Sequence, residues 1–186
     1  MRVISGEAKG RRLKAPADNR IRPTADKTKE ALFDIIGGEV HGARVLDLFA
    51  GTGNLGIEAL SRGARRALFV DVAKKAVTII RANVDLVKYG DRCEVWQEDA
   101  FSALSRLGRM GRRFDLVFCD PPYGHQFVER SLRFLVLGHL VENNGLVAVE
   151  HHRKDKLPQR VETLLMLGER FFGETAVTFY RQKAEP

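Results

Sequence analysis

The segment from Phe114 to Gly124 combines residue types that could hold a flat group carrying an amine. An apolar run of strand length ends in Asp120, and Pro121 and Pro122 then exclude both a strand ladder and a helix interior. The turn offers carboxylate and backbone carbonyl acceptors beside the ring of Tyr123. We interpret these four residues as a catalytic site for a nucleobase. The alternative is a rigid turn with a half-buried tyrosine.

Aspartates lie at the carboxyl ends of the first four predicted strands. Open α/β sheets bind ligands at the carboxyl ends of their strands, so side chains at these ends are expected to meet at one edge of the sheet. We expect four carboxylates to form one acidic rim in an otherwise basic protein: Asp47, Asp71, Asp99 and Asp120.

A glycine-rich turn, residues 51–56, follows the first of these aspartates and matches G-x-G-x-x-G. Proteins that bind NAD and proteins that bind S-adenosylmethionine (SAM) share this pattern, and Asp71 follows at the spacing that suits the ribose hydroxyls. Asp47 and Asp120 would repel a pyrophosphate but attract the sulfonium and ammonium of SAM. The acidic rim therefore favours SAM.

Two of the rim aspartates have simpler alternative roles. Asp99 would accept a hydrogen bond from the adenine amine, with the N–H of Ala100 facing a ring nitrogen, but it could also serve as a helix N-cap. Asp47 could accept hydrogen bonds from N–H groups of the glycine turn.

The surrounding pattern supplies the elements that would position these residues. Strands alternate with helices at a spacing that predicts a mostly parallel, doubly wound α/β sheet. The final two strands are separated only by a Gly-Glu pair, which predicts an antiparallel hairpin and seven strands in all. The expected strands span 44–49, 67–70, 93–96, 114–119, 145–150, 163–172 and 175–181, and the helices after residue 50 span 55–62, 73–88, 100–107 and 128–137.

The N-terminal part of the chain carries most of the excess positive charge. The protein has 186 residues and a formal net charge of +7, and residues 1–29 contain nine Lys or Arg against three acids. We predict a basic arm with a short hairpin at 1–22, ahead of a catalytic domain at 23–186. A basic arm suits a nucleic acid, although a solvated arm without function is the alternative. The expected RNA contacts are Arg2, Lys9, Arg11, Arg12, Lys14 and Arg22.

Composition excludes several other classes of protein. No apolar run approaches the length of a membrane span, and the opening residues do not resemble a signal peptide, so we expect a cytoplasmic, monomeric protein with no membrane partner. Cys93 and Cys119 lack C-x-x-C spacing and are interpreted as core residues. His151 and His152 are adjacent, and we expect no metal.

Several of these segments together resemble one enzyme family. Residues 47–64 and 120–123, with Arg22-Pro23-Thr24 and Gly173-Glu174-Thr175, resemble the RsmD family of 16S ribosomal RNA guanine-N2 methyltransferases. The resemblance implies a Rossmann-like class I methyltransferase fold and methyl transfer from SAM to the exocyclic N2 of a guanine, in 16S rRNA or an assembling small subunit. It implies a cofactor site of Thr24, Asp47, Phe49, Ala50, Gly51, Gly53, Asn54, Asp71, Val72, Asp99, Ala100 and Asp120.

Three alternative functions stay open at this point. Because D-P-P-Y also occurs in amino-methyltransferases that act on adenine, an adenine-N6 enzyme for DNA or RNA is the first. The same glycine turn would suit an NAD-dependent oxidoreductase, and an RNA-binding module without a cofactor would explain the basic arm alone.

Overall fold

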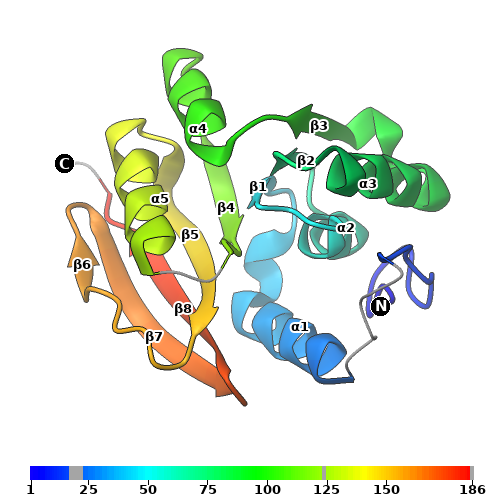
Figure 1. The fold of residues 1–186 in the computed structure, drawn as a ribbon, viewed down its shortest axis with the longest axis horizontal. Helices are drawn as coiled ribbons and strands as arrows, with labels where there is room; N and C mark the ends of the chain where they lie inside the picture. The colour runs from blue at the N-terminus through cyan, green and yellow to red at the C-terminus, as the bar shows by residue number, and fades with distance from the viewer. Residues whose placement is uncertain (17–22, 123–124, 185–186) are drawn as a thin grey trace.

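The computed structural model describes residues 1–16, 23–122 and 125–184. One eight-stranded sheet runs through the molecule in the order β3-β2-β1-β4-β5-β8-β7-β6 (Figure 1). The first five strands are parallel, and the last three are antiparallel to their neighbours. The strands are β1 (Arg44–Leu48), β2 (Arg66–Asp71), β3 (Cys93–Gln97), β4 (Phe114–Cys119), β5 (Val141–His152), β6 (Arg160–Val161), β7 (Leu164–Phe172) and β8 (Thr175–Gln182).

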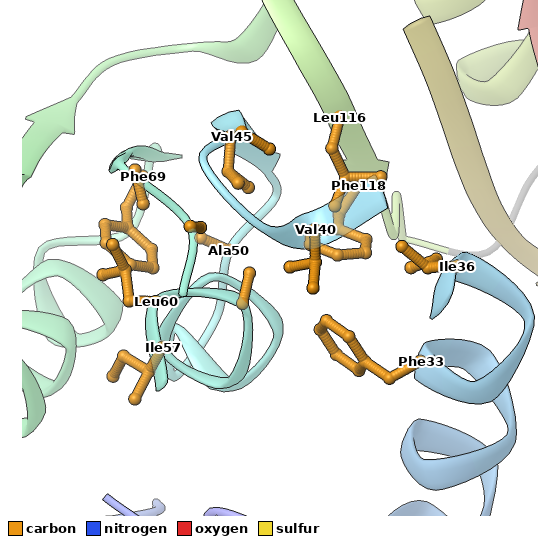
Figure 2. Packing of buried hydrophobic residues seen from close by; sticks show 14 of the residues in the cluster. Phe33, Ile36, Val40, Val45, Ala50, Ile57, Leu60, Phe69, Leu116 and Phe118 are labelled. Carbon is orange, nitrogen blue, oxygen red and sulfur yellow. The ribbon is translucent and has the colours of Figure 1, made fainter. Parts of the chain in front are cut away.

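Helices cover both faces of the sheet, so the fold has three layers. On one face lie α1 (Pro23–Ile36), α2 (Asn54–Ser61) and α3 (Lys74–Val87), whose apolar side chains form one core with the sheet (Figure 2). On the other face lie α4 (Ala100–Arg109) and α5 (His125–Leu137), which form a second core. Phe33 of α1 packs on Phe118 of β4 with ring centroids 5.6 Å apart. Two short 3₁₀ helices, η1 (Gly37–Val40) and η2 (Gly90–Arg92), connect these elements.

The predicted fold class is confirmed, and β4 has the predicted bounds. The sheet has eight strands and not the predicted seven, because Arg160–Val161 pairs with β7 as a further strand. A strand of two residues is too short to show a periodic pattern in the sequence. Strand β5 begins at Val141, four residues before the prediction, because Val141 pairs with Phe114 across an irregularity in the register. The polar residues between Val141 and Gly145 conceal this strand in the sequence. Cys119 is buried, and Cys93 is half-buried.

The basic arm packs against α2 instead of forming a regular hairpin. A single antiparallel bridge joins Arg2 to Arg12, so the expected two-stranded ribbon is wrong in its extent. The Val3 N–H still donates across the arm to the carbonyl of Arg11 at 2.9 Å. The pairing stops after it because the N–H groups of Ile4 and Ser5 donate to the Glu58 carboxylate of α2 at 2.8 and 3.0 Å. Three apolar side chains of the arm are buried in the core beneath it: Val3, Ala8 and Leu13. The proposed domain boundary after residue 22 stays a prediction.

Gly6 permits the close approach between the arm and α2. Its φ is +81°, and a Cβ at this position would lie 1.7 Å from the carbonyl oxygen of Ser61. The Glu7 N–H donates to that same oxygen at 2.9 Å. Only glycine therefore fits here, for reasons of both backbone conformation and space.

A buried ion pair joins the arm, α1 and α2. The Lys29 ammonium lies 3.0 Å from Glu58 and donates to the carbonyl of Arg2 at 2.6 Å and to the side-chain oxygen of Asn54 at 2.7 Å. Both side chains of the pair are almost fully buried, and desolvation lowers the pKa of Lys29. Because Asn54 is the first residue of α2, the same ammonium contacts the arm and the end of the glycine turn.

Candidate functional site

The sheet brings the carboxyl ends of five parallel strands to one edge. Because the strand order is β3-β2-β1-β4-β5, the acids in or just after the last residues of these strands occur in the spatial order Asp99, Asp71, Asp47, Asp120 and Glu150. Asp47 is paired with Phe118 in the register of β1 and β4, so it lies on the strand beside the one that leads to Asp120. The four predicted aspartates thus lie along one edge.

Asp71 and Asp47 hold the glycine turn against the sheet. The Asp71 carboxylate accepts hydrogen bonds from the N–H groups of Gly51 and Ala73, both at 2.8 Å. Asp47 is buried and accepts a hydrogen bond from the N–H of Gly56 at 2.9 Å. Asp47 therefore does act as an acceptor for the glycine turn, as the alternative interpretation expected. A Cβ on Gly56 would lie 2.3 Å from the Phe69 ring, which requires glycine at this contact.

Three further predicted cofactor residues lie just beyond the ends of β3, β1 and β2: Asp99, Phe49 and Val72. Asp99 caps α4 by accepting hydrogen bonds from the N–H groups of Phe101 and Ser102, as the alternative interpretation of Asp99 expected. Phe49 has a φ of 57°, uncommon for a residue other than glycine, and its ring lies 6.4 Å from that of Phe101. Val72 is exposed at the end of β2.

Parts of the predicted site lie outside the described residues. Tyr123 and Arg22 fall in the segments that are not described, and so does the side chain of Thr24, although its backbone belongs to the first turn of α1. The described arm cations Arg2, Lys9, Arg11, Arg12 and Lys14 are all exposed. The predicted roles of these residues stay predictions.

The acids near the glycine turn lie close enough together that ionising all of them is unfavourable. Desolvation, with the nearby charge of Asp71, raises the pKa of Asp47 to about 7. Desolvation, Glu150 and Asp47 raise the pKa of Asp120 well above its usual range. A positive charge bound among these carboxyls would relieve both their repulsion and their loss of hydration, so the site suits a cationic ligand.

We expect Asp47 to make the protein less stable as the pH rises from about 4 to 7. In this window the folded state keeps a proton on Asp47 that the unfolded state has released, so the free energy of unfolding falls with rising pH, by up to about 4 kcal/mol. Asp47→Asn should remove this contribution and raise stability above pH 7. Urea unfolding of both proteins at pH 5 and pH 8 measures the difference.

The control for this experiment is Asp34→Asn, because Asp34 is exposed on α1. Its stability should follow that of the natural protein at both pH values. If Asp47→Asn behaves in the same way, the buried carboxyl does not carry the expected proton.

A cavity of about 300 Å³ lies beside Asp120, on the side formed by β5, α5 and the turn before β8. Its lining combines apolar, acidic and imidazole groups: Asp120, Pro121, Pro122, Val128, Glu150, His151, His152, Asp155 and Thr175. Its volume is at the lower end of the range for small-molecule sites, so it suits a group the size of a base. Glu150 was missed in the sequence analysis, although it is an acid at the end of the fifth predicted strand.

The described part of the chain contains neither a candidate metal site nor a candidate membrane span. No group of three or more potential ligand side chains there could hold a metal ion. Within the same residues, no helix is both long enough and apolar enough to cross a membrane.

The fold is that of a class I methyltransferase. The structure superimposes on a solved structure from Escherichia coli, titled "Putative methyltransferase yhhF", with a TM-score of 0.89 and 30% identity, covering 100% of this chain and 99% of that one. The same fold occurs at 16% identity and a TM-score of 0.69 in a structure titled "Crystal structure of SMU.776, a putative methyltransferase complexed with SAH", where SAH is S-adenosylhomocysteine; the match covers 87% of this chain and 50% of that one.

Residues 1–181 match the model of the family described as "Conserved hypothetical protein 95", and the chain belongs to this family. It is 40% identical over 183 residues to "Putative rRNA methyltransferase YlbH" of Bacillus subtilis, covering 98% of this chain and 100% of the relative. It is 30% identical over 185 residues to "Ribosomal RNA small subunit methyltransferase D" of Escherichia coli, covering 100% and 91%. The resemblance to the RsmD family is thereby confirmed.

Proposed function

We propose that this protein transfers a methyl group from SAM to the exocyclic N2 of a guanine in 16S ribosomal RNA, on the free RNA or in an assembling small subunit. The observation that carries the proposal is the position of the Asp120-Pro121-Pro122 segment directly after β4, the strand that pairs with β1, which leads into the glycine turn. Full-length relatives named as rRNA methyltransferases support it.

The turn and its acids fit SAM as the donor, which would supply a methyl group on a positively charged sulfur. Asp47 and Asp120 would attract the cationic groups of the donor, because a positive charge placed between neighbouring carboxylates offsets the repulsion among them. Each oxygen of Asp71 accepts one backbone N–H and has a further lone pair for a ribose hydroxyl. Asp99 and Ala100 would contact the adenine.

The acceptor side would work mainly by positioning. The lone pair of a guanine N2 amine is delocalised into the ring, so the nitrogen is a poor nucleophile. The Asp120 carboxylate and the Pro121 carbonyl would accept its two hydrogens and direct the lone pair at the methyl carbon. As the new N–C bond forms, the S–C bond breaks with its electron pair left on sulfur, and N2 releases one proton. Asp120 can accept that proton, because its pKa is raised.

Tyr123 would stack on the target base, and the arm would bind phosphates. A base stacked on an aromatic ring gains about 1 to 3 kcal/mol. Contacts from Lys and Arg to phosphates supply affinity that does not depend on sequence.

The decisive experiment supplies labelled SAM together with 16S rRNA or with partly assembled small subunits from cells that lack the protein. We expect label in one of these RNAs and N2-methylguanosine in mass spectrometry of its nucleosides. N6-methyladenosine would instead favour the adenine alternative. A complete lack of transfer to every RNA would favour an RNA-binding module.

Reversing the charge of the arm should weaken RNA binding without changing the donor site. We expect Arg11→Glu, Arg12→Glu and Lys14→Glu together to lower RNA affinity and to flatten its dependence on salt, because fewer counterions are released. Filter binding at several salt concentrations measures the slope, and calorimetry with SAM should give an unchanged dissociation constant. Arg65→Glu, an exposed substitution outside the arm, is the matched control. Equal RNA affinity in the triple variant and the control would exclude the arm as the RNA contact.

A further inference from the structure

Glu150 forms part of the cavity beside Asp120 but has no role in the reaction described above. Val149 of β5 pairs with Cys119 of β4, so the residues that follow them, Glu150 and Asp120, lie next to each other at adjacent strand ends. Both line the cavity of about 300 Å³. A base held at Asp120 in this cavity would therefore also meet the Glu150 carboxylate.

The Glu150 side chain lacks a protein donor among the residues that the structure describes. Over 1–16, 23–122 and 125–184, no hydrogen bond or ion pair reaches its carboxylate. Its neighbour His151 differs, because its ring nitrogens lie 3.0 Å from the carbonyl oxygen of His152 and 2.7 Å from the hydroxyl of Thr178. Burial raises the pKa of Glu150. A half-buried carboxylate on the wall of a cavity, with no protein donor, can accept a hydrogen bond from a ligand held there.

The donor pattern of guanine matches two adjacent carboxylates. On its Watson–Crick edge guanine presents the N1–H beside the N2 amine, so two donors point in the same direction. Adenine presents a lone pair at N1 beside its N6 amine, and a carboxylate facing that lone pair would repel it. The O6 of guanine needs a donor, and the Thr175 hydroxyl on another wall of the cavity can supply one.

We propose that Glu150 selects guanine as the target base, by accepting the N1–H while Asp120 accepts a hydrogen of the N2 amine. This inference rests on the proposed function, since it assumes that N2 of a guanine is the methylated atom. It adds a base-recognising residue from β5, the fifth parallel strand.

The test compares Glu150→Gln with the natural protein on two RNA substrates. One carries guanine at the modified position and the other carries 2-aminopurine, which keeps the N2 amine but has a lone pair at N1 and lacks O6. The loss of O6 is the same for both proteins, so the difference between their preferences reports on Glu150. The natural protein should prefer guanine at least about tenfold in kcat/KM, because the analogue leaves Glu150 without its donor. The side-chain amide that the substitution introduces can donate to N1 of 2-aminopurine. The variant should therefore lower the ratio of kcat/KM on guanine to kcat/KM on 2-aminopurine at least about tenfold.

Glu142→Gln is the matched control, because Glu142 lies at the other end of β5, in surface ion pairs with Arg44 and Arg113. Its ratio should equal that of the natural protein, and both variants should bind SAM with unchanged affinity. A ratio unchanged by Glu150→Gln overturns the role of Glu150, even though the natural protein methylates guanine N2. Failure of the natural protein to methylate guanine N2 overturns the proposed function itself.

A binding measurement covers the case in which Glu150→Gln is inactive on both substrates. Inosine keeps the N1–H but lacks the N2 amine, so RNA with inosine at this position binds without reacting. The natural protein should bind it more tightly than the 2-aminopurine RNA, and Glu150→Gln should reduce that preference at least about tenfold. An unchanged preference contradicts the inference.

Discussion

Asp120→Ala should reduce methyl transfer at least about 100-fold while the protein still binds SAM within about tenfold of its natural affinity. The variant loses the carboxylate that would hold the N2 amine at the methyl carbon. The donor site keeps Asp47, Asp71 and the glycine turn, whose hydrogen bonds do not involve Asp120. Single-turnover transfer of labelled methyl and calorimetric titration with SAM measure the two quantities separately.

Two companion variants make this result specific to the Asp120 carboxylate. Asp120→Asn keeps one oxygen acceptor at the same position, so its rate should lie between those of the natural protein and the alanine variant. Asp85→Ala removes an exposed acid from α3 and should leave the rate unchanged. Full turnover in Asp120→Ala would refute the role that we assign to this residue.

Glu58→Ala should cost about 3 to 5 kcal/mol of stability and release the arm from α2. The substitution leaves the Lys29 ammonium buried without its anion, and it removes the acceptor for the N–H groups of Ile4 and Ser5. Urea unfolding measures the loss of stability. Limited digestion with trypsin reports on the arm, because the hydrogen-bonded backbone at Arg11 can adopt the extended form that a protease needs only once the arm detaches.

The control for the Glu58 experiment is Glu30→Ala, in which an exposed acid of α1 is removed. Surface substitutions of this kind usually change stability by less than about 0.5 kcal/mol. If Glu58→Ala keeps both the stability and the trypsin resistance of this control, the buried ion pair does not hold the arm.

The sheet and the line of aspartates could be predicted because each depends on local patterns. An apolar run followed by an acid or by glycine marks a strand end, and the parallel order then brings successive ends to one edge. The strand that leads to Asp120 was predicted with its observed bounds for this reason. The same rule applied to the fifth strand would have found Glu150, but the predicted rim included aspartates alone.

Other features depend on contacts between distant segments, which a local pattern does not reveal. The buried position of Lys29 arises from acceptors on the arm and on α2, and the Ile4 N–H and its acceptor Glu58 are separated by 54 residues. In the sequence, Lys29 is one of several cations in a basic segment. Strand β6 has only two residues, and it exists because β7 presents a free edge to it.

The contacts that join the arm to α2 affect how the protein would meet its RNA. A flexible tail must become ordered when it binds, and that loss of conformational freedom reduces the net affinity. Here Gly6, Lys29 and Glu58 hold the start of the arm on α2, and Asn83 of α3 accepts from the Lys14 N–H, so the backbone of residues 1–14 is held before any partner arrives. The exposed cations on this part of the arm are therefore preorganised, and association with a polyanion carries little entropic penalty there.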